Sequence, residues 1–330
     1  MQILLHVLFL IAGFFMLIKG ADFFIVSSSS IARKFRISPL IIGLTLVAFG
    51  TSLPELAVSF AASISARSQG LTADIAMGNV IGSNMANLTL ILGTSALIMP
   101  VLVKKSMRKK EFPFLISTAL LIAILGFFFQ ADQAIVWWEA VILLLMFAFY
   151  MYLMITTKKE ISDEEIPVVD TKKAIILLLI GIAGVSIGGF LVTEGADFIA
   201  IELLTTSFGM TVTRATTLVG LSIVALGTSL PELVTSAMAA KKGEADIALG
   251  NVIGSNIFNT LLIVGLSGVI VPLGLNQDVL IDMIILIGVT SLVVILGMFK
   301  SKLSKFDGLL LLLIYVSYIT YIILRALSII

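Results

Sequence analysis

Cysteine is absent from this 330-residue sequence, and histidine occurs only once, at His6. The chain can therefore form neither disulfides nor thiolate metal sites, and one histidine excludes a histidine-rich metal site. Charged residues are scarce at 12%, and the formal net charge is only +1, which gives no indication of nucleic-acid binding. The sequence also lacks a nucleotide-binding loop and a nucleophile–base pair, so we predict that the protein is not an enzyme.

Hydrophobic residues make up 59% of the chain, as is typical of an all-α polytopic membrane protein. About 20 apolar residues suffice for a helix to cross a bilayer. Ten apolar segments reach roughly this length, and we interpret the first as a span and not as a cleaved signal. The predicted spans are 2–30, 38–65, 72–99, 112–129, 134–155, 172–205, 213–240, 245–271, 279–299 and 307–327.

The second half of the chain repeats the first. Residues 43–56 match 220–233 at 11 of 14 positions, and 73–93 match 245–265 at 15 of 21. The predicted domains are a five-helix repeat at 1–155, a polar linker at 156–171 and a second five-helix repeat at 172–330. Because five is odd, the second repeat enters the membrane in the opposite direction. Such inverted repeats are the architecture of many secondary transporters, with broken helices meeting at the midplane.

Lysine and arginine indicate the orientation of the spans. With ten spans, 17 of the 21 basic residues fall in loops on one side. Because cytoplasmic loops carry the excess of basic residues, we expect the 156–171 linker in the cytoplasm and both termini outside, in a cell (inner) membrane.

The first repeated motif, GTSLPE, combines a backbone break with oxygen ligands. Pro54 has no N–H, so the carbonyl of Gly50 loses its helical partner. Thr51, Ser52 and Glu55 add two hydroxyls and a carboxylate within one turn, and the same motif ends at Glu232 in the second half. Such groups are costly to leave unpaired in a bilayer, and a cation is the partner that suits them.

The second repeated motif, GNVIGSN followed by a further Asn, supplies neutral oxygens. Positions four apart share one helical face, so Ser83 lies with Asn87 and Ser255 with Asn259, while Asn84 and Asn256 point elsewhere. The glycines of this motif, at 78, 82, 250 and 254, are expected to allow close helix packing. We predict that helices 2, 3, 7 and 8 are broken around a central ion site.

Two glutamates near the membrane centre, with no basic residue in the motifs, give the site a charge of about −2. Protons could neutralise it, and so could one divalent or two monovalent cations. Calcium takes six to eight oxygen ligands, including carbonyls and carboxylates, and this set fits that preference better than it fits zinc or copper.

The duplicated GTSLPE and GNVIGSN motifs resemble the α-repeats of the sodium/calcium exchangers, within the cation/calcium antiporter superfamily. The resemblance covers all ten spans and implies that calcium and sodium compete for overlapping central sites while spans 1 and 6 slide as a gate. It also implies that the ion ligands come from the backbone or side chains of Ala48, Thr51, Ser52, Glu55, Ser83, Asn87, Ala225, Thr228, Ser229, Glu232, Ser255 and Asn259.

We therefore expect a secondary antiporter that exchanges Na⁺ for Ca²⁺ by alternating access, with no cofactor, in contact with membrane lipid and as a monomer. Some members of the family carry Asp where this chain has Asn259, and that Asp is tied to potassium use, so Asn259 argues against potassium dependence. An H⁺/Ca²⁺ antiporter of the same fold is the alternative, and a cation channel is a third. The hydroxyls at 51, 52, 228 and 229 favour sodium, since protons need no such cage. Four charged residues on spans 1 and 6 are expected to pair with one another or to mark a gate: Lys19, Asp22, Glu194 and Asp197.

Overall fold

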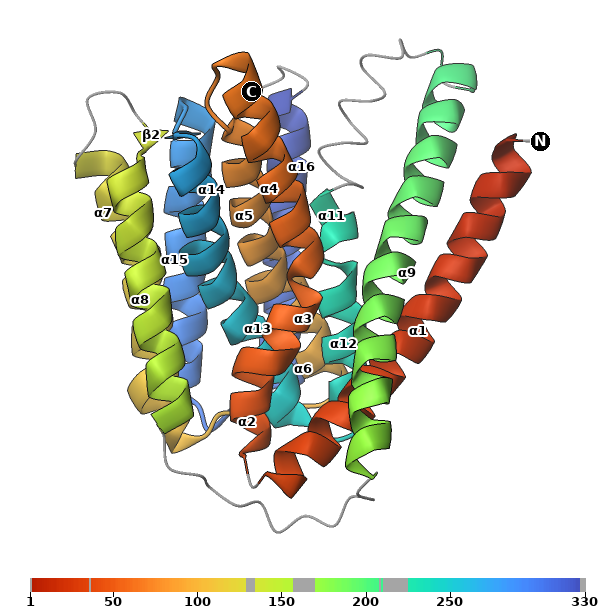
Figure 1. Ribbon diagram of the computed structural model, residues 1–330, viewed down its shortest axis with the longest axis vertical. Helices are drawn as coiled ribbons and strands as arrows, with labels where there is room; N and C mark the ends of the chain where they lie inside the picture. Colours follow the sequence, from red (N-terminus) through yellow and green to blue (C-terminus); the bar gives the residue numbers. More distant parts are fainter. Residues whose placement is uncertain are drawn as a thin grey trace.

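The computed structural model describes residues 2–35, 37–128, 134–156, 170–207, 209 and 225–326 (Figure 1). The first half contains the helices α1 (Gln2–Lys34), α2 (Pro39–Ile42), η1 (Gly43–Val47), α3 (Ala48–Thr51), α4 (Leu53–Gln69), α5 (Asp74–Ala86), η2 (Asn87–Ile91), α6 (Leu92–Ile98), η3 (Met107–Glu111), α7 (Phe112–Phe128) and α8 (Trp137–Thr156), with the strands β1 (Val101–Leu102) and β2 (Ala134–Ile135).

The second half follows the same order. It contains the helices α9 (Thr171–Thr206), α11 (Ala225–Thr228), α12 (Leu230–Lys241), α13 (Ala245–Phe258), η5 (Asn259–Ile263), α14 (Val264–Ile270), α15 (Gln277–Phe299) and α16 (Lys305–Ala326), with the strands β3 (Leu273–Gly274) and β4 (Lys302–Leu303). Most of the predicted linker, and the first part of the predicted span 213–240, lie outside the described residues.

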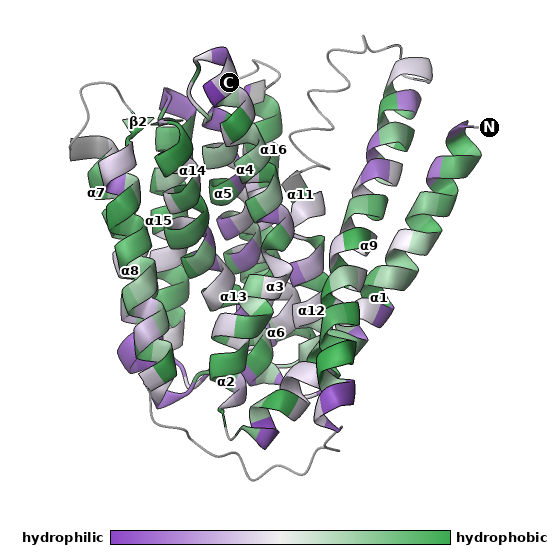
Figure 2. Ribbon diagram, in the orientation of Figure 1, coloured by the Kyte–Doolittle hydropathy of each residue, from purple (hydrophilic) through white to green (hydrophobic). Residues whose placement is uncertain are grey.

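Seven of the described helices are long and apolar enough to cross a membrane, or eight if the bent pair 39–51 and 53–69 forms one span. Their apolar side chains face outward: Leu145 on α8 is 65% exposed, and Leu179 on α9 is 62% exposed. In Figure 2, hydrophobic residues dominate the outer helices, and hydrophilic residues gather at several helix ends. The chain is therefore a multi-pass membrane protein, and ten spans remain a prediction.

Two short antiparallel ladders join the halves. β1 pairs with β4, with Val101 opposite Leu303, and β2 pairs with β3, with Ala134 opposite Gly274. In the aligned repeats β1 corresponds to β3 and β2 corresponds to β4, so the two ladders are related in the same way as the repeats. Each ladder connects one half directly to the other.

The repeated motifs lie where helices change direction or pitch. α3 and α4 meet at Ser52, whose backbone leaves the helical region at φ −83° and ψ 9°, and the chain bends there by 47°. Pro54 prevents a straight helix at this point because it cannot donate to the preceding turn. α5 and α13 instead remain helical through the π-helical turns η2 and η5, which begin at Asn87 and Asn259. π-helical turns inside α-helices are frequent at functional sites.

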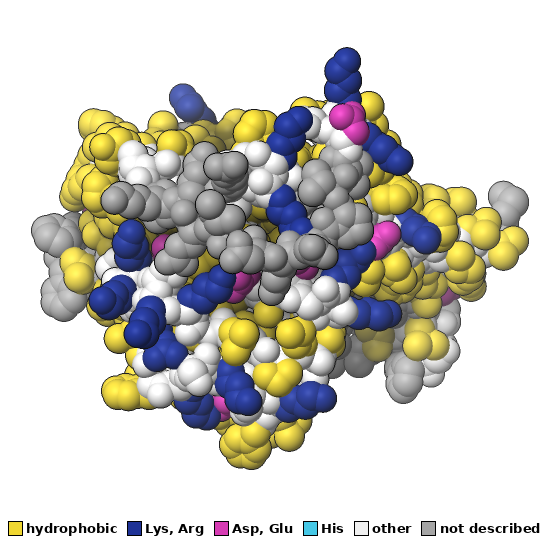
Figure 3. Space-filling view, turned by 90° about the horizontal axis from the view of Figure 1, so that it is seen from below, with side chains coloured by type: hydrophobic (Ala, Val, Ile, Leu, Met, Phe, Trp, Pro, Cys, Tyr) yellow, Lys and Arg dark blue, Asp and Glu magenta, His cyan; other side chains and the backbone are white. Residues whose placement is uncertain are grey.

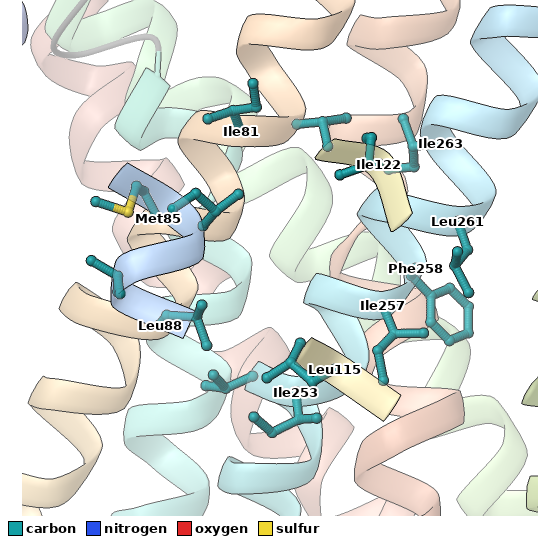
Figure 4. Packing of buried hydrophobic residues seen from close by; sticks show 14 of the residues in the cluster. Ile81, Met85, Leu88, Leu115, Ile122, Ile253, Ile257, Phe258, Leu261 and Ile263 are labelled. Carbon is teal, nitrogen blue, oxygen red and sulfur yellow. The ribbon is translucent and has the colours of Figure 1, made fainter. Parts of the chain in front are cut away.

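The hydrophobic core forms two clusters. The larger packs α5, α7 and α13 together through residues such as Ile81, Leu115 and Ile257 (Figure 4). The smaller joins α1 and α9 to α12 through Leu17, Phe24 and Val185, among others. α1 and α9 therefore have packing of their own, separate from the main bundle.

Glycines bring α1 and α9 into backbone contact along their lengths. A methyl group added at Gly184 would lie 2.9 Å from the Cα of Gly20, and one at Gly188 would lie 2.7 Å from the amide nitrogen of Leu17. Helices in lipid associate through such close packing, because burial of apolar area does not drive them together there. The two long helices therefore cross as one closely packed pair (Figure 1).

Glycines also explain how α13 crosses α2 and η1. A methyl group at Gly254 would lie 2.6 Å from the carbonyl oxygen of Leu44, and one at Gly250 would lie 2.7 Å from that of Leu40. These contacts agree with the predicted role of both glycines. The prediction for Gly78 and Gly82 remains open, because no described atom lies within 4 Å of a methyl group there, and the segment that the repeat would set against them lies outside the described residues.

Lysine and arginine gather on one face, at the bottom of Figure 1, where α1 ends and α9 begins. Figure 3 shows this face, which we call the lysine-rich face. Two contacts hold α1 to the α12–α13 turn: Lys242 pairs with Asp22 at 2.5 Å, and the Ser29 hydroxyl donates to Glu244 at 3.1 Å. Asp22 thus pairs with a lysine from the opposite repeat.

Candidate cation site

The bends at Ser52 and Ser229 place each glutamate at the start of a new helix. Ser229, with φ −87° and ψ 2°, repeats the geometry of Ser52. Glu55 lies in the first turn of α4, and Glu232 lies in the first turn of α12. A helix N-terminus carries partial positive charge, which favours a carboxylate there.

Each carboxylate is bonded by a serine of the opposite half. The Ser52 hydroxyl donates to Oε1 of Glu232 at 2.9 Å, and the Ser229 hydroxyl lies 3.3 Å from Oε1 of Glu55. Ser83 adds to the Ser229–Glu55 pair: its hydroxyl lies 3.4 Å from the same Glu55 oxygen and 3.3 Å from the Ser229 hydroxyl. The structure thus brings residues of both repeats into one buried centre.

This centre contains many polar atoms without partners. Glu55 is 1% exposed and Glu232 is fully buried, and Oε2 of each has no hydrogen-bond partner among the described residues. The same holds for the side-chain amides of Asn87 and Asn259 and for the Ser255 hydroxyl. Buried polar atoms are rarely left unsatisfied. A set of unpaired oxygens beside two carboxylates is what a dehydrated cation requires.

The donor set decides which cation fits. The candidate ligands are carboxylate, amide and hydroxyl oxygens, which suit Ca²⁺ and Na⁺ and do not suit soft metals. The described residues contain no cluster of three or more histidine, cysteine or acidic side chains, so two carboxylates supply the negative charge.

The other predicted ligands lie around the same helix breaks. Ala48 is fully buried, and its carbonyl accepts from the Ser52 amide at 3.0 Å. The Thr51 hydroxyl lies 3.1 Å from the Val47 carbonyl. Thr228 ends α11, and its hydroxyl has no partner among the described residues. Ala225 begins α11, and its side chain lies outside the described part of the structure.

Sequence reasoning missed several polar residues next to the site. Asn251 Nδ2 donates to Ser236 at 2.9 Å, and Asn251 Oδ1 accepts from Thr51 at 3.1 Å. Asn79 Nδ2 lies 3.0 Å from Ser59 and 3.2 Å from the Glu55 carbonyl. Both asparagines belong to the repeated Gly-Asn pair that opens GNVIGSN, and this repetition was the signal that could have identified them.

Asn84 and Asn256 face away from the site, as the helical spacing predicted. Asn84 Nδ2 donates to the Thr260 hydroxyl at 2.9 Å, and Asn256 Nδ2 donates to the carbonyl of Val252 in its own helix at 2.8 Å. Position 88, which corresponds to Thr260 in the first repeat, is a leucine and offers Asn256 no equivalent partner.

A cavity of about 610 Å³ leads towards this centre. It lies between α9 and the starts of α4 and α12, with Pro54, Ser186, Asp197, Thr228 and Pro231 among its lining residues. Its α9 residues, between Ser186 and Asp197, lie in the middle and second half of that helix, away from the end on the lysine-rich face. The cavity therefore reaches the site from the side opposite the lysine-rich face.

Comparisons with known proteins found relatives that match nearly the whole chain. The family model described as "Sodium/calcium exchanger protein" matches residues 5–156 and 173–324. A putative antiporter, CaxA of Alkalimonas amylolytica, is 36% identical over 96% of this chain and 98% of its own. The sodium/calcium exchanger MaX1 of Methanosarcina acetivorans is 34% identical with the same coverage.

A solved structure has the same fold. The sodium-calcium exchanger NCX_Mj, soaked with 2.5 mM Na⁺ and 10 mM Sr²⁺, superposes with a TM-score of 0.80 and 30% identity, covering 96% of this chain and 99% of NCX_Mj. A second structure of NCX_Mj, soaked with zero Na⁺ and Ca²⁺, also gives a TM-score of 0.80, at 32% identity.

Proposed function

This chain belongs to the sodium/calcium exchanger protein family, and from that premise we propose that it exchanges Na⁺ for Ca²⁺ across a membrane. It is a transporter, and both ions are its substrates. One central site binds the two ions alternately and is exposed to one side of the membrane at a time. Bare carboxylates are costly in a bilayer, so the empty site resists the change of access and couples the two fluxes.

The observation that carries this proposal is that a serine of each half bonds a glutamate of the other half. Ser52 bonds Glu232 and Ser229 bonds Glu55, each beside a carboxylate oxygen that has no partner among the described residues. A relative movement of the halves changes both pairs at once. A change of access therefore alters the contacts of an ion held between the two pairs.

The proposed ligands are the twelve residues predicted from the motifs. Support for them is strongest where buried oxygens are unpaired, at Glu55, Glu232, Asn87, Asn259 and Ser255. Ala48 and Ala225 would contribute through their carbonyls alone. No cofactor is required, because the transported ion itself neutralises the site.

The proposed architecture is ten spans in two inverted repeats, 1–155 and 172–330, joined by the 156–171 linker. The protein lies in a cell (inner) membrane, with the lysine-rich face on the cytoplasmic side and both termini outside. It functions as a monomer. The 610 Å³ cavity then opens outward. Labelling of single cysteines placed in the linker and at the C-terminus, from each side of sealed vesicles, tests this orientation.

Neutralising either glutamate should abolish transport. Glu55→Gln and Glu232→Gln each remove one charge from the carboxylate pair. Na⁺-driven ⁴⁵Ca²⁺ uptake into vesicles should then fall at least about a hundredfold, because a buried charged group loses one of its ligands.

Glu202→Gln is the matched control, because Glu202 lies on α9 but does not line the cavity. Its flux should remain near that of the unmodified protein. Near-normal flux in both Glu55→Gln and Glu232→Gln would exclude the proposed site.

Proton coupling is the second candidate, since two buried carboxylates can also carry protons. Ca²⁺ uptake driven by a pH gradient in the absence of sodium would favour it. Uptake under separately imposed Na⁺, K⁺ and H⁺ gradients should show dependence on Na⁺ alone. Flux that saturates and requires a counter-ion would exclude a channel.

A further inference from the structure

Asn251 connects the two halves beside the cation site. It is fully buried, and its amide bonds Ser236 of its own half and Thr51 of the other. Ser236 lies one helical turn after Glu232, and Thr51 directly precedes Ser52, the residue that bonds Glu232. Asn251 therefore bonds a neighbour of each partner of the Ser52–Glu232 pair, whichever way its amide is turned.

Asn79 occupies the corresponding position in the first repeat, but its contacts are incomplete. It bonds Ser59, one turn after Glu55, as Asn251 bonds Ser236. The residue that corresponds to Thr51 is Thr228, and its hydroxyl has no hydrogen-bond partner in the described part of the chain. One threonine–asparagine bond of a symmetric pair is thus present, and the other is not.

This asymmetry coincides with the difference between the two faces. Thr228 lines the 610 Å³ cavity, on the open side of the site. On the lysine-rich side, Asp22–Lys242 and Ser29–Glu244 join α1 to the α12–α13 turn. The threonine–asparagine bond is therefore formed between Thr51 and Asn251, on the side where α1 is joined to that turn. It is absent between Thr228 and Asn79, where the threonine borders the cavity.

We propose that Asn251 and Asn79 are positioning residues of a hydrogen-bond switch, a role that rests on the proposed alternating access. Thr51 bonds Asn251 when the lysine-rich side is closed. In the opposite state Thr228 bonds Asn79, and Thr51 releases Asn251. Each bond fixes the serine–glutamate pair next to it, so the switch links the state of the gate to the geometry of the ion ligands.

The absence of cysteine from the chain makes a direct test possible. Ala57 is exposed in the cavity, so labelling of Ala57→Cys by a membrane-impermeant thiol reagent reports how often the cavity is open. Labelling of Ser68→Cys, which is exposed and outside the cavity, normalises for reagent access. Measurements without Na⁺ or Ca²⁺ separate the gate from ion binding.

The two asparagines should shift labelling in opposite directions. Asn251→Ala removes a bond of the present state, so the Ala57→Cys labelling rate should fall about fivefold. Asn79→Ala removes a bond of the opposite state, so labelling should be faster than in the unmodified protein. The isosteric pair Thr51→Val and Thr228→Val should repeat this pattern with less disturbance of packing.

Thr320→Val is the matched control, since its exposed hydroxyl donates only to the Val316 carbonyl, and its labelling rate should not change. General destabilisation would move both asparagine variants in the same direction. That result, or an unchanged rate in Asn251→Ala and Thr51→Val, would overturn the switch. Because labelling measures access and not flux, the switch can fail while sodium-driven calcium transport stands, and the reverse also holds.

Discussion

Ser52 and Ser229 each have a partner in the other half of the chain, and this predicts equal effects of two distant substitutions. Ser52→Ala removes the donor to Glu232, and Ser229→Ala removes the donor to Glu55. Loss of one hydrogen bond to a charged group should raise the KM for Ca²⁺ about tenfold in each variant.

Ser63→Ala provides a buried control, because the Ser63 hydroxyl donates to the Ser59 carbonyl within α4. Its KM should stay unchanged. An effect confined to one of the two site serines would argue against equivalent roles for the two halves.

At the residue scale, the motifs identified Glu55 and Glu232 but not which serines bond them. Glu55 and Glu232 were identifiable because carboxylates after a proline break in an apolar segment require an explanation. The partners of Asn79 and Asn251 were not, because a polar residue in a membrane helix can bond its own helix, as Asn256 does, or a neighbouring one, as Asn84 does. The packing of α5 against α4, and of α13 against α3 and α12, decides between these choices.

The crossing of α1 and α9 predicts that bulk at the contact is more damaging than bulk elsewhere. Gly184→Leu would push the helices apart, because even a methyl group there lies 2.9 Å from Gly20. Overpacking of this kind costs about 1–3 kcal/mol. Calcium flux should fall about tenfold or more.

Gly288→Leu is the corresponding control on α15, where an added methyl group meets no described atom within 4 Å. Its flux should stay close to normal at equal protein levels. Equal losses in both variants would show that the α1–α9 contact has no special role.

At the element scale, the bends were predictable and the π-helical turns were not. Proline specifies a break through its missing N–H, so the change of direction before α4 follows from Pro54. The turns η2 and η5 arise from a shift of backbone pairing by one residue, which no residue type specifies. The repeated asparagines at their starts, Asn87 and Asn259, are the only local indication.

The whole molecule is held together by contacts between halves, which predicts that the connecting chain can be cut. The two strand ladders and the packing of α13 against η1 join the repeats without the linker. Co-expression of 1–163 with 164–330 should restore at least about half of the calcium flux, measured in vesicles. Either fragment alone should give none, and flux from a single fragment would contradict a site shared by both.

At this largest scale, the duplication was evident in the sequence, but the asymmetry of the fold was not. The GTSLPE and GNVIGSN copies are identical, so nothing in them indicates which face is closed. The choice depends on residues outside the motifs, such as Asp22 and Lys242, whose pairing requires the α12–α13 turn to lie against α1.

In the proposed alternating access, the backbone contact between α1 and α9 would also limit leakage through the protein. Because the two helices touch at Gly20 and Gly184, they would move in that mechanism as one lever. A lever that tilts away from the bundle at one end would press against it at the other. A passage open at both ends would require the lever to come apart in its middle. The glycines of the proposed gate would thus keep its two ends from opening together.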